Sequence, residues 1–219
     1  MNHPIKNILA LPKGMLLFLG IYALSFPVLW LEKHLTGQSL LVDWLGLSPA
    51  LVWKGQVWRV VSYALLAGGV VAWVVNFFWL ATLVSILARD WSSKTFWAYC
   101  LVAAFAGAVP IVLIAPQADV RVFSAGAIIF ALLVAWDRLY RRERLLMLGL
   151  GEVSVRQAAI VIAVINAVIT FFSCGGWLFT LSMMCGAVAG WIYLAIGQRR
   201  VMSRPSQVAE SERIARLEL

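Results

Sequence analysis

Long runs without charged residues, separated by short charged segments, are the main pattern of this chain. Such runs cover residues 60–88, 95–115 and 157–198, and an apolar run at 14–31 precedes them. A helix needs about 20 residues to cross a hydrocarbon core of about 30 Å, so the three shorter runs hold one span each. The run 157–198 is too long for one helix, and its Ser-Cys-Gly-Gly sequence at 173–176 is a natural turn. The pattern therefore predicts two spans there and five in all.

A fifth, shorter uncharged run covers residues 122–136, and Asp137 and Arg138 follow it directly. As a helix, its 15 residues reach only about 22 Å, which is short of a full crossing. One interpretation is that this segment is no span at all. We favour a helix that begins below the membrane surface, in a recess lined by the other helices. Non-helical backbone at that depth is tolerated only where protein or water surrounds it.

The positions of the basic residues favour the sixth helix. With six spans and the N-terminus inside, 14 of the 18 Lys and Arg residues face the cytoplasm and the other four face outward. Membrane proteins show this bias, and leaving out the short helix would place the arginines of the C-terminal tail outside. We therefore expect an all-α polytopic membrane protein with both termini cytoplasmic, in a bacterial inner membrane. Residues 1–13 form its cytoplasmic N-terminal segment, 14–197 its six-helix membrane domain and 198–219 a polar cytoplasmic tail.

The composition agrees with a membrane protein and argues against other classes. Hydrophobic residues make up 63% of the 219 residues and charged residues 13%, which is too little charge for a soluble surface. The net charge of +8 is spread along the flanks of the apolar runs and forms no basic domain, which argues against nucleic acid as a partner. Cys100, Cys174 and Cys185 lack the spacing of a metal site. Nothing in the sequence predicts a metal or a cofactor.

The segment between the first two spans, from Lys33 to Arg59, is too long for a tight turn and too apolar for a soluble domain. It contains Trp44, Trp53 and Trp58 among several leucines and valines. Tryptophan is enriched at membrane interfaces because its ring is amphipathic. We therefore predict that this first loop lies in the interface, with Arg59 facing outward.

The entrance to the second span resembles a known family. Residues 55–66 read GQVWRVVSYALL and are similar to the segment that leads into the second helix of rhomboid intramembrane proteases, including its Trp-Arg pair. The next ten residues, AGGVVAWVVN, fit the rhomboid pattern H-G-G-x-x-H-x-x-x-N in spacing. Its glycines and its asparagine, here Asn76, match, while Ala67 and Ala72 stand at the two histidine positions.

The position of the rhomboid catalytic serine is also altered. Residues 123–128 read FSAGAI where rhomboids place G-x-S-G at the start of their short fourth helix; Gly126 matches and Ala125 stands at the serine position. Ser124 lies one position earlier, which on a helix is a rotation of about 100°. Its hydroxyl would then point away from the serine position. Alternatively, Ser124 lies in the preceding loop or caps the helix.

The position of the catalytic histidine has changed as well. Residues 183–190 read MMCGAVAG and resemble the rhomboid pattern H-x-G-G-x-x-x-G; Gly186 and Gly190 match, and Met183 stands at the histidine position. Small residues at this spacing permit close approach of helices. We expect these two glycines to face Gly126 within the molecule rather than a second copy of the chain. The resemblance implies a six-helix rhomboid-like bundle with a short, recessed fourth helix and a degenerate catalytic site.

The remaining residues support no protease chemistry. A serine protease needs a nucleophile and a base within hydrogen-bond reach. The chain has two histidines, His3 and His34, and neither lies in a span. We therefore expect no catalytic residues, and we expect Asn76 to form a hydrogen bond between helices. The alternative is a divergent intramembrane protease that uses Ser124 or Cys185.

The resemblance also implies a class of function. Rhomboid relatives without catalysis, such as the derlins and iRhoms, bind or guide other membrane proteins. This chain is thus expected to be a pseudoprotease in the lipid bilayer that binds one or more transmembrane proteins as adaptor, assembly factor or subunit of a membrane complex, with no homo-oligomer required. A small transporter or channel is less favoured, because such a protein would carry charges well inside its spans.

Overall fold

Helices form almost all of the described chain. The computed structural model describes residues 11–37, 39–67, 69–116, 122–141, 144–147, 151–174 and 177–201. The predictions for His3, Arg121, the turn at 175–176 and the tail from residue 202 onward fall outside the described residues. The elements are α2 (Lys13–Thr36), α3 (Leu40–Leu45), α4 (Pro49–Trp53), α5 (Arg59–Ser62), the 3₁₀ helix η1 (Tyr63–Leu65), α6 (Val70–Leu87), α7 (Ser93–Ile114), α8 (Gly126–Leu139), β1 (Arg144–Met147), β2 (Gly151–Ser154), α9 (Val155–Cys174) and α10 (Trp177–Val201).

Four of these helices are long and apolar enough to cross a membrane. They are α2, α6, α7 and the Trp177–Gly197 part of α10. The Val155–Val168 part of α9 is a shorter apolar helix. All five overlap the apolar runs where the sequence predicts spans, which confirms the largely helical fold. The segment from Lys13 onward is helical because it has the uninterrupted apolar length that a span requires.

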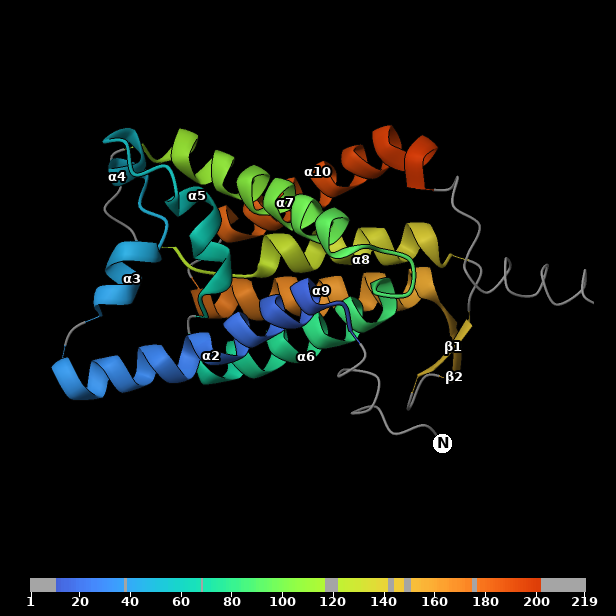
Figure 1. The fold of residues 1–219 in the computed structure, drawn as a ribbon, viewed down its shortest axis with the longest axis horizontal. Coiled ribbons are helices and arrows are strands. Elements are labelled where there is room, and N and C mark those ends of the chain that lie inside the picture. Colours follow the sequence, from blue (N-terminus) through green and yellow to red (C-terminus); the bar gives the residue numbers. More distant parts are fainter. Residues whose placement is uncertain are drawn as a thin grey trace, which may run out of the picture.

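The short α8 lies in the centre of the bundle. It packs against α6, α7, α9 and α10, and Figure 1 shows it running between α7 and α9. Ten of its 14 residues are buried, so protein covers it on nearly every side. The helix begins at Gly126 rather than at Val122, because Val122 exchanges two backbone hydrogen bonds with Leu47 of the first loop and is held in an extended conformation.

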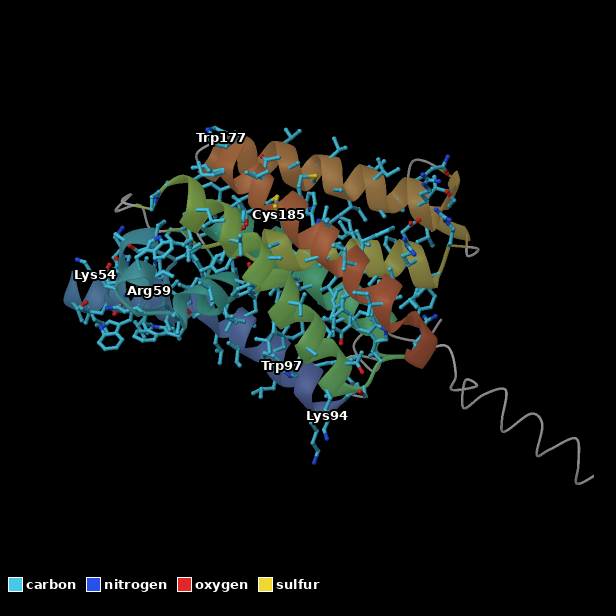
Figure 2. The ribbon with its side chains drawn as sticks, turned by 90° about the horizontal axis from the view of Figure 1, so that it is seen from above. Lys54, Arg59, Lys94, Trp97, Trp177 and Cys185 are labelled. Atoms are coloured by element: carbon cyan, nitrogen blue, oxygen red, sulfur yellow. The ribbon has the colours of Figure 1, made fainter. Side chains whose placement is uncertain are left out.

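The two ends of the bundle differ in structure. The short helices α3, α4 and α5 lie at one end, and the antiparallel β1–β2 hairpin lies at the other (Figure 1). The sequence analysis predicted none of these elements, since each is too short to show a helical or strand period. Lys54 and Arg59 lie at the loop end, while Lys94 lies toward the opposite end (Figure 2). The long helices between them separate the charged segments, as the charge pattern predicted.

Candidate functional site

Ala125 and Met183, the positions that the sequence analysis compared with the rhomboid serine and histidine, lie close to each other and are apolar. Ala125 has no exposed surface, and Met183 is 2% exposed. Gly126, at the start of α8, faces the Met183 side chain so closely that an added Cβ would collide with the methionine methyl group. Met183 Cγ would lie 3.0 Å from the same Cβ. The start of α8 and the first half of α10 are therefore in direct contact here.

Ser124 acts as a local hydrogen-bond acceptor next to this contact. Its Oγ accepts a hydrogen bond from the Gly126 backbone N–H at 3.1 Å, and its own backbone N–H donates to the Tyr63 carbonyl at 3.2 Å. The first N–H groups of a helix have no partner within the helix, and a serine hydroxyl just before it satisfies one of them. The sequence left several interpretations of Ser124 open. The structure shows it in the loop before α8, where its Oγ accepts a hydrogen bond from the first residue of that helix.

The other nucleophile candidate, Cys185, is a free thiol on α10 and is half-buried (Figure 2). Within the described part of the chain there is one histidine, His34. It is exposed in the last turn of α2, and its Nδ1 lies 3.1 Å from the Trp30 carbonyl oxygen. His34 therefore lies at the C-terminal end of α2 and not beside Ser124 or Cys185 in the bundle.

The glycines of α10 allow three helices to meet closely. A Cβ on Gly186 would lie 2.5 Å from the Ala127 carbonyl oxygen of α8. A Cβ on Gly190 would collide with the Tyr99 hydroxyl of α7 and would lie 3.0 Å from the Ala131 Cβ. The sequence analysis expected both glycines to face Gly126. The structure instead places Gly186 against Ala127, one residue after Gly126, and Gly190 against Ala131, about one helical turn further along α8, because α8 and α10 run in the same direction.

Buried tyrosines link the helices, and the sequence analysis did not single them out. The Tyr99 hydroxyl donates to the Ala131 carbonyl of α8 at 2.6 Å, and the Tyr63 hydroxyl donates to the Ala104 carbonyl of α7 at 3.0 Å. Both side chains are at most 1% exposed. A tyrosine inside an uncharged run is the sequence signal that could have revealed these hydrogen bonds, because a buried hydroxyl needs a hydrogen-bond partner.

The α6 residues of the degenerate motif lie on the other side of α8. Ala67 is buried just before α6, while Ala72 and Asn76 are half-buried on it. The Asn76 side chain lies next to the Tyr22 hydroxyl of α2. The buried Tyr22 hydroxyl nevertheless has no hydrogen-bond partner among the described residues, so the expected hydrogen bond of Asn76 between helices is not formed with it. No metal-binding group of three His, Cys, Asp or Glu side chains occurs among the described residues.

Arg59, which the charge pattern assigns to the outer side of the membrane, is buried within the first loop. It is 3% exposed, and its guanidinium donates to the Gln56 Oε1 at 2.7 Å, to the Gly46 carbonyl at 2.7 Å and to the Asp43 carbonyl at 2.6 Å. The Ser62 hydroxyl adds a bond of 2.7 Å to the Leu45 carbonyl. Carbonyl oxygens of Asp43 in α3 and of Gly46 at its end satisfy the cation inside the loop. The hydrogen bonds of Arg59 and Ser62 therefore stabilise the fold of the first loop.

The three loop tryptophans present their rings on the surface. Trp44, Trp53 and Trp58 are 65%, 63% and 46% exposed. Two of the indole N–H groups are bonded: Trp58 Nε1 donates to the Trp44 carbonyl at 3.2 Å and Trp53 Nε1 to the Val112 carbonyl at 3.4 Å. Exposed indole rings on a loop held to the bundle are typical of a membrane interface.

The apolar helices, the enclosed α8 and the exposed apolar side chains around it define an integral membrane protein with transmembrane helices. Residues 15–211 match the family model described as "Eukaryotic integral membrane protein (DUF1751)", and the chain belongs to this family. No curated protein matches the chain. The predicted location in a bacterial inner membrane is therefore wrong, because the family is eukaryotic. Hydropathy and charge bias follow the same rules in both kinds of membrane, so the sequence pattern could not separate them.

Proposed function

We propose that this chain is a non-proteolytic, rhomboid-like membrane protein that binds another transmembrane protein as adaptor, assembly factor or subunit of a membrane complex. The observation that carries the proposal is the contact between Gly126 and Met183. At these positions a rhomboid protease would hold its serine and histidine in a cavity that admits water. Here the same place is filled by a methionine side chain and by Ala125, which is fully buried.

The remaining candidate nucleophiles support the same proposal. An activated serine or cysteine needs a base that takes its proton. Ser124 accepts a hydrogen bond from the Gly126 N–H, and Cys185 carries a free thiol, but the histidine of the described chain lies at the end of α2. A protein that keeps the helix arrangement without this chemistry retains lateral surfaces to which a transmembrane helix can bind.

We also propose that the fold is a six-helix rhomboid-like bundle with a recessed α8. The 20 residues of α9 extend over about 30 Å, which is enough to cross the hydrocarbon core. The 14 residues of α8 extend over about 21 Å, and the surrounding helices shield its ends. Six crossings place the α6–α7 turn and the β hairpin on the same side of the membrane, with the first loop opposite.

The topology is tested by labelling single cysteines with a membrane-impermeant maleimide, after the native cysteines have been replaced by alanine. Cysteine introduced at Arg89 and at Arg141 should react from the same side, and cysteine at Lys54 from the other. All three positions are exposed. Reaction of the Arg141 position from the Lys54 side would contradict the six-helix bundle.

Partner binding is tested by site-specific photo-crosslinking in native membranes. A photoreactive residue is placed at one exposed apolar position on each outer helix, and the cross-linked products are identified by mass spectrometry. A dedicated partner should cross-link from one or two adjacent helices, and gentle purification should recover it in near-stoichiometric amount. Absence of a cross-link from every face, together with a monomeric native mass, would refute the binding proposal. The positions are Leu24, Phe78, Phe105, Val164 and Val188.

The protease alternative is tested in the same preparation. The purified chain, its Ser124→Ala variant and its Cys185→Ala variant are incubated with a model transmembrane substrate in liposomes. We expect no cleavage by any of the three. Cleavage by the unmodified chain that either substitution abolishes would overturn the non-proteolytic proposal.

A further inference from the structure

An arginine at the end of α8 lies on a tryptophan of α10. The guanidinium carbon of Arg138 is 4.8 Å from the centre of the Trp191 ring. Arg138 is half-buried and Trp191 is 49% exposed. A cation on an aromatic face is attracted by the π electrons, and this attraction is stronger where water is excluded. The pair therefore fixes a positive charge on the outer surface of the bundle.

This surface lies within the apolar part of α10. Trp191 belongs to a stripe at helical spacing with Val188, Ile192 and Ile196, which are 58%, 45% and 77% exposed. The candidate span of α10 ends at Gly197, so the Cα of Trp191 lies about 9 Å before that end along the helix axis. Acyl chains cover such a stripe in a bilayer. A guanidinium held beside it is at the edge of the hydrocarbon, where an unpaired charge is costly.

The described residues supply no carboxylate for this cation. In the described part of the chain, the Arg138 guanidinium contacts the Trp191 ring. The neighbouring Asp137 has one buried carboxylate oxygen, which faces into the protein. Asp90, at the same end, accepts a hydrogen bond from the Tyr140 hydroxyl. Arg141, also exposed at this end, adds further positive charge.

We propose that Arg138 and Trp191 form a binding site for the headgroup of an anionic phospholipid. The planar guanidinium presents its N–H edges to two phosphate oxygens while its face rests on the indole ring. The acyl chains of the same lipid lie along Val188, Ile192 and Ile196. A phospholipid supplies both an anion for the guanidinium and apolar chains for the stripe on α10. A soluble anion would have to leave water to reach this position. The proposal does not depend on the proposed function.

Native mass spectrometry of the purified full chain tests the site. The protein is depleted of lipid in detergent, then titrated with phosphatidylserine or with phosphatidylcholine of the same chain length. We expect one phosphatidylserine to be retained preferentially, and we expect its apparent affinity to fall at least about fivefold in Arg138→Gln, since one basic residue near a membrane contributes about 1 kcal/mol. Trp191→Leu should weaken binding, and Arg138→Lys should give an intermediate affinity.

Arg141→Gln is the matched control, because it removes an exposed cation from the same end and should leave the retained lipid unchanged. Equal retention of the two lipids, or equal affinity of Arg138→Gln and the unmodified chain, would overturn the proposal. Millimolar inorganic phosphate is added in a parallel arm and should not displace the lipid. Displacement would show a site for soluble anions and refute the lipid assignment. Gel filtration of each variant verifies that a loss of binding is not a loss of folding.

Discussion

Gly186→Ala should destabilise the bundle, although the same substitution in a free helix would stabilise it. Alanine has a higher helix propensity than glycine by about 1 kcal/mol. At Gly186, however, the new methyl group would lie 2.5 Å from the Ala127 carbonyl oxygen and 2.8 Å from its Cα. These are backbone atoms of a buried helix, so α8 and α10 must move apart. Overpacking of this kind costs up to about 3 kcal/mol, and the expected net loss of stability is about 2 kcal/mol.

Gly197→Ala is the matched control on the same helix, because nothing lies within 4 Å of a Cβ at Gly197. This variant gains only the higher helix propensity of alanine. The two variants should therefore differ by about 3 kcal/mol in free energy of unfolding. For a chain of this size, that difference corresponds to about 6–12 °C in melting temperature. The measurement is the fraction of monodisperse protein that remains on size exclusion after heating in detergent. A Gly186→Ala variant that melts at or above Gly197→Ala would refute the close contact of α8 with α10.

Three further substitutions test the site and the first loop, each read by the same melting assay. Met183→Ala should cost about 2–5 kcal/mol by leaving a cavity against α8, whereas Met184→Ala, which changes a side chain that is 43% exposed, should be close to neutral. Arg59→Gln should lose about 2–5 kcal/mol because buried carbonyl groups lose charged donors, and Lys54→Gln should change little. Ser124→Ala should lose about 1 kcal/mol because the Gly126 N–H loses its Ser124 Oγ acceptor; an unchanged melting temperature would contradict a stabilising role of this hydrogen bond.

The membrane class and the positions of the helices could be predicted from the sequence, because they depend on local composition. An uncharged run of about 20 residues has few stable states in a bilayer other than a helix. The short run before Asp137 was also informative: its length left open whether it is a span, and the positions of the basic residues favoured a sixth helix. The structure shows a helix here, α8, with ten of its 14 residues buried.

The partners of individual side chains were decided by the tertiary structure. Arg59 follows three residues after Gln56 in a segment that the sequence predicts to lie in the membrane interface, and its guanidinium bonds the carbonyl oxygens of Asp43 and Gly46. These carbonyls become available only when the loop folds back. Likewise, the sequence predicted that Gly186 permits close packing, but its contact with Ala127 depends on the direction and offset of α8 relative to α10.

The contact between Gly126 and Met183 also depends partly on the sequence and partly on the tertiary structure. The sequence by itself determined which chemical groups are present: alanine and methionine stand at positions 125 and 183, and no histidine lies in an uncharged run. Only the tertiary structure decided that Met183 fills the space at Gly126 and that the Ser124 oxygen bonds the start of α8. The physical reason is that composition fixes solubility in the bilayer, whereas contacts between helices distant in sequence depend on how their surfaces fit together.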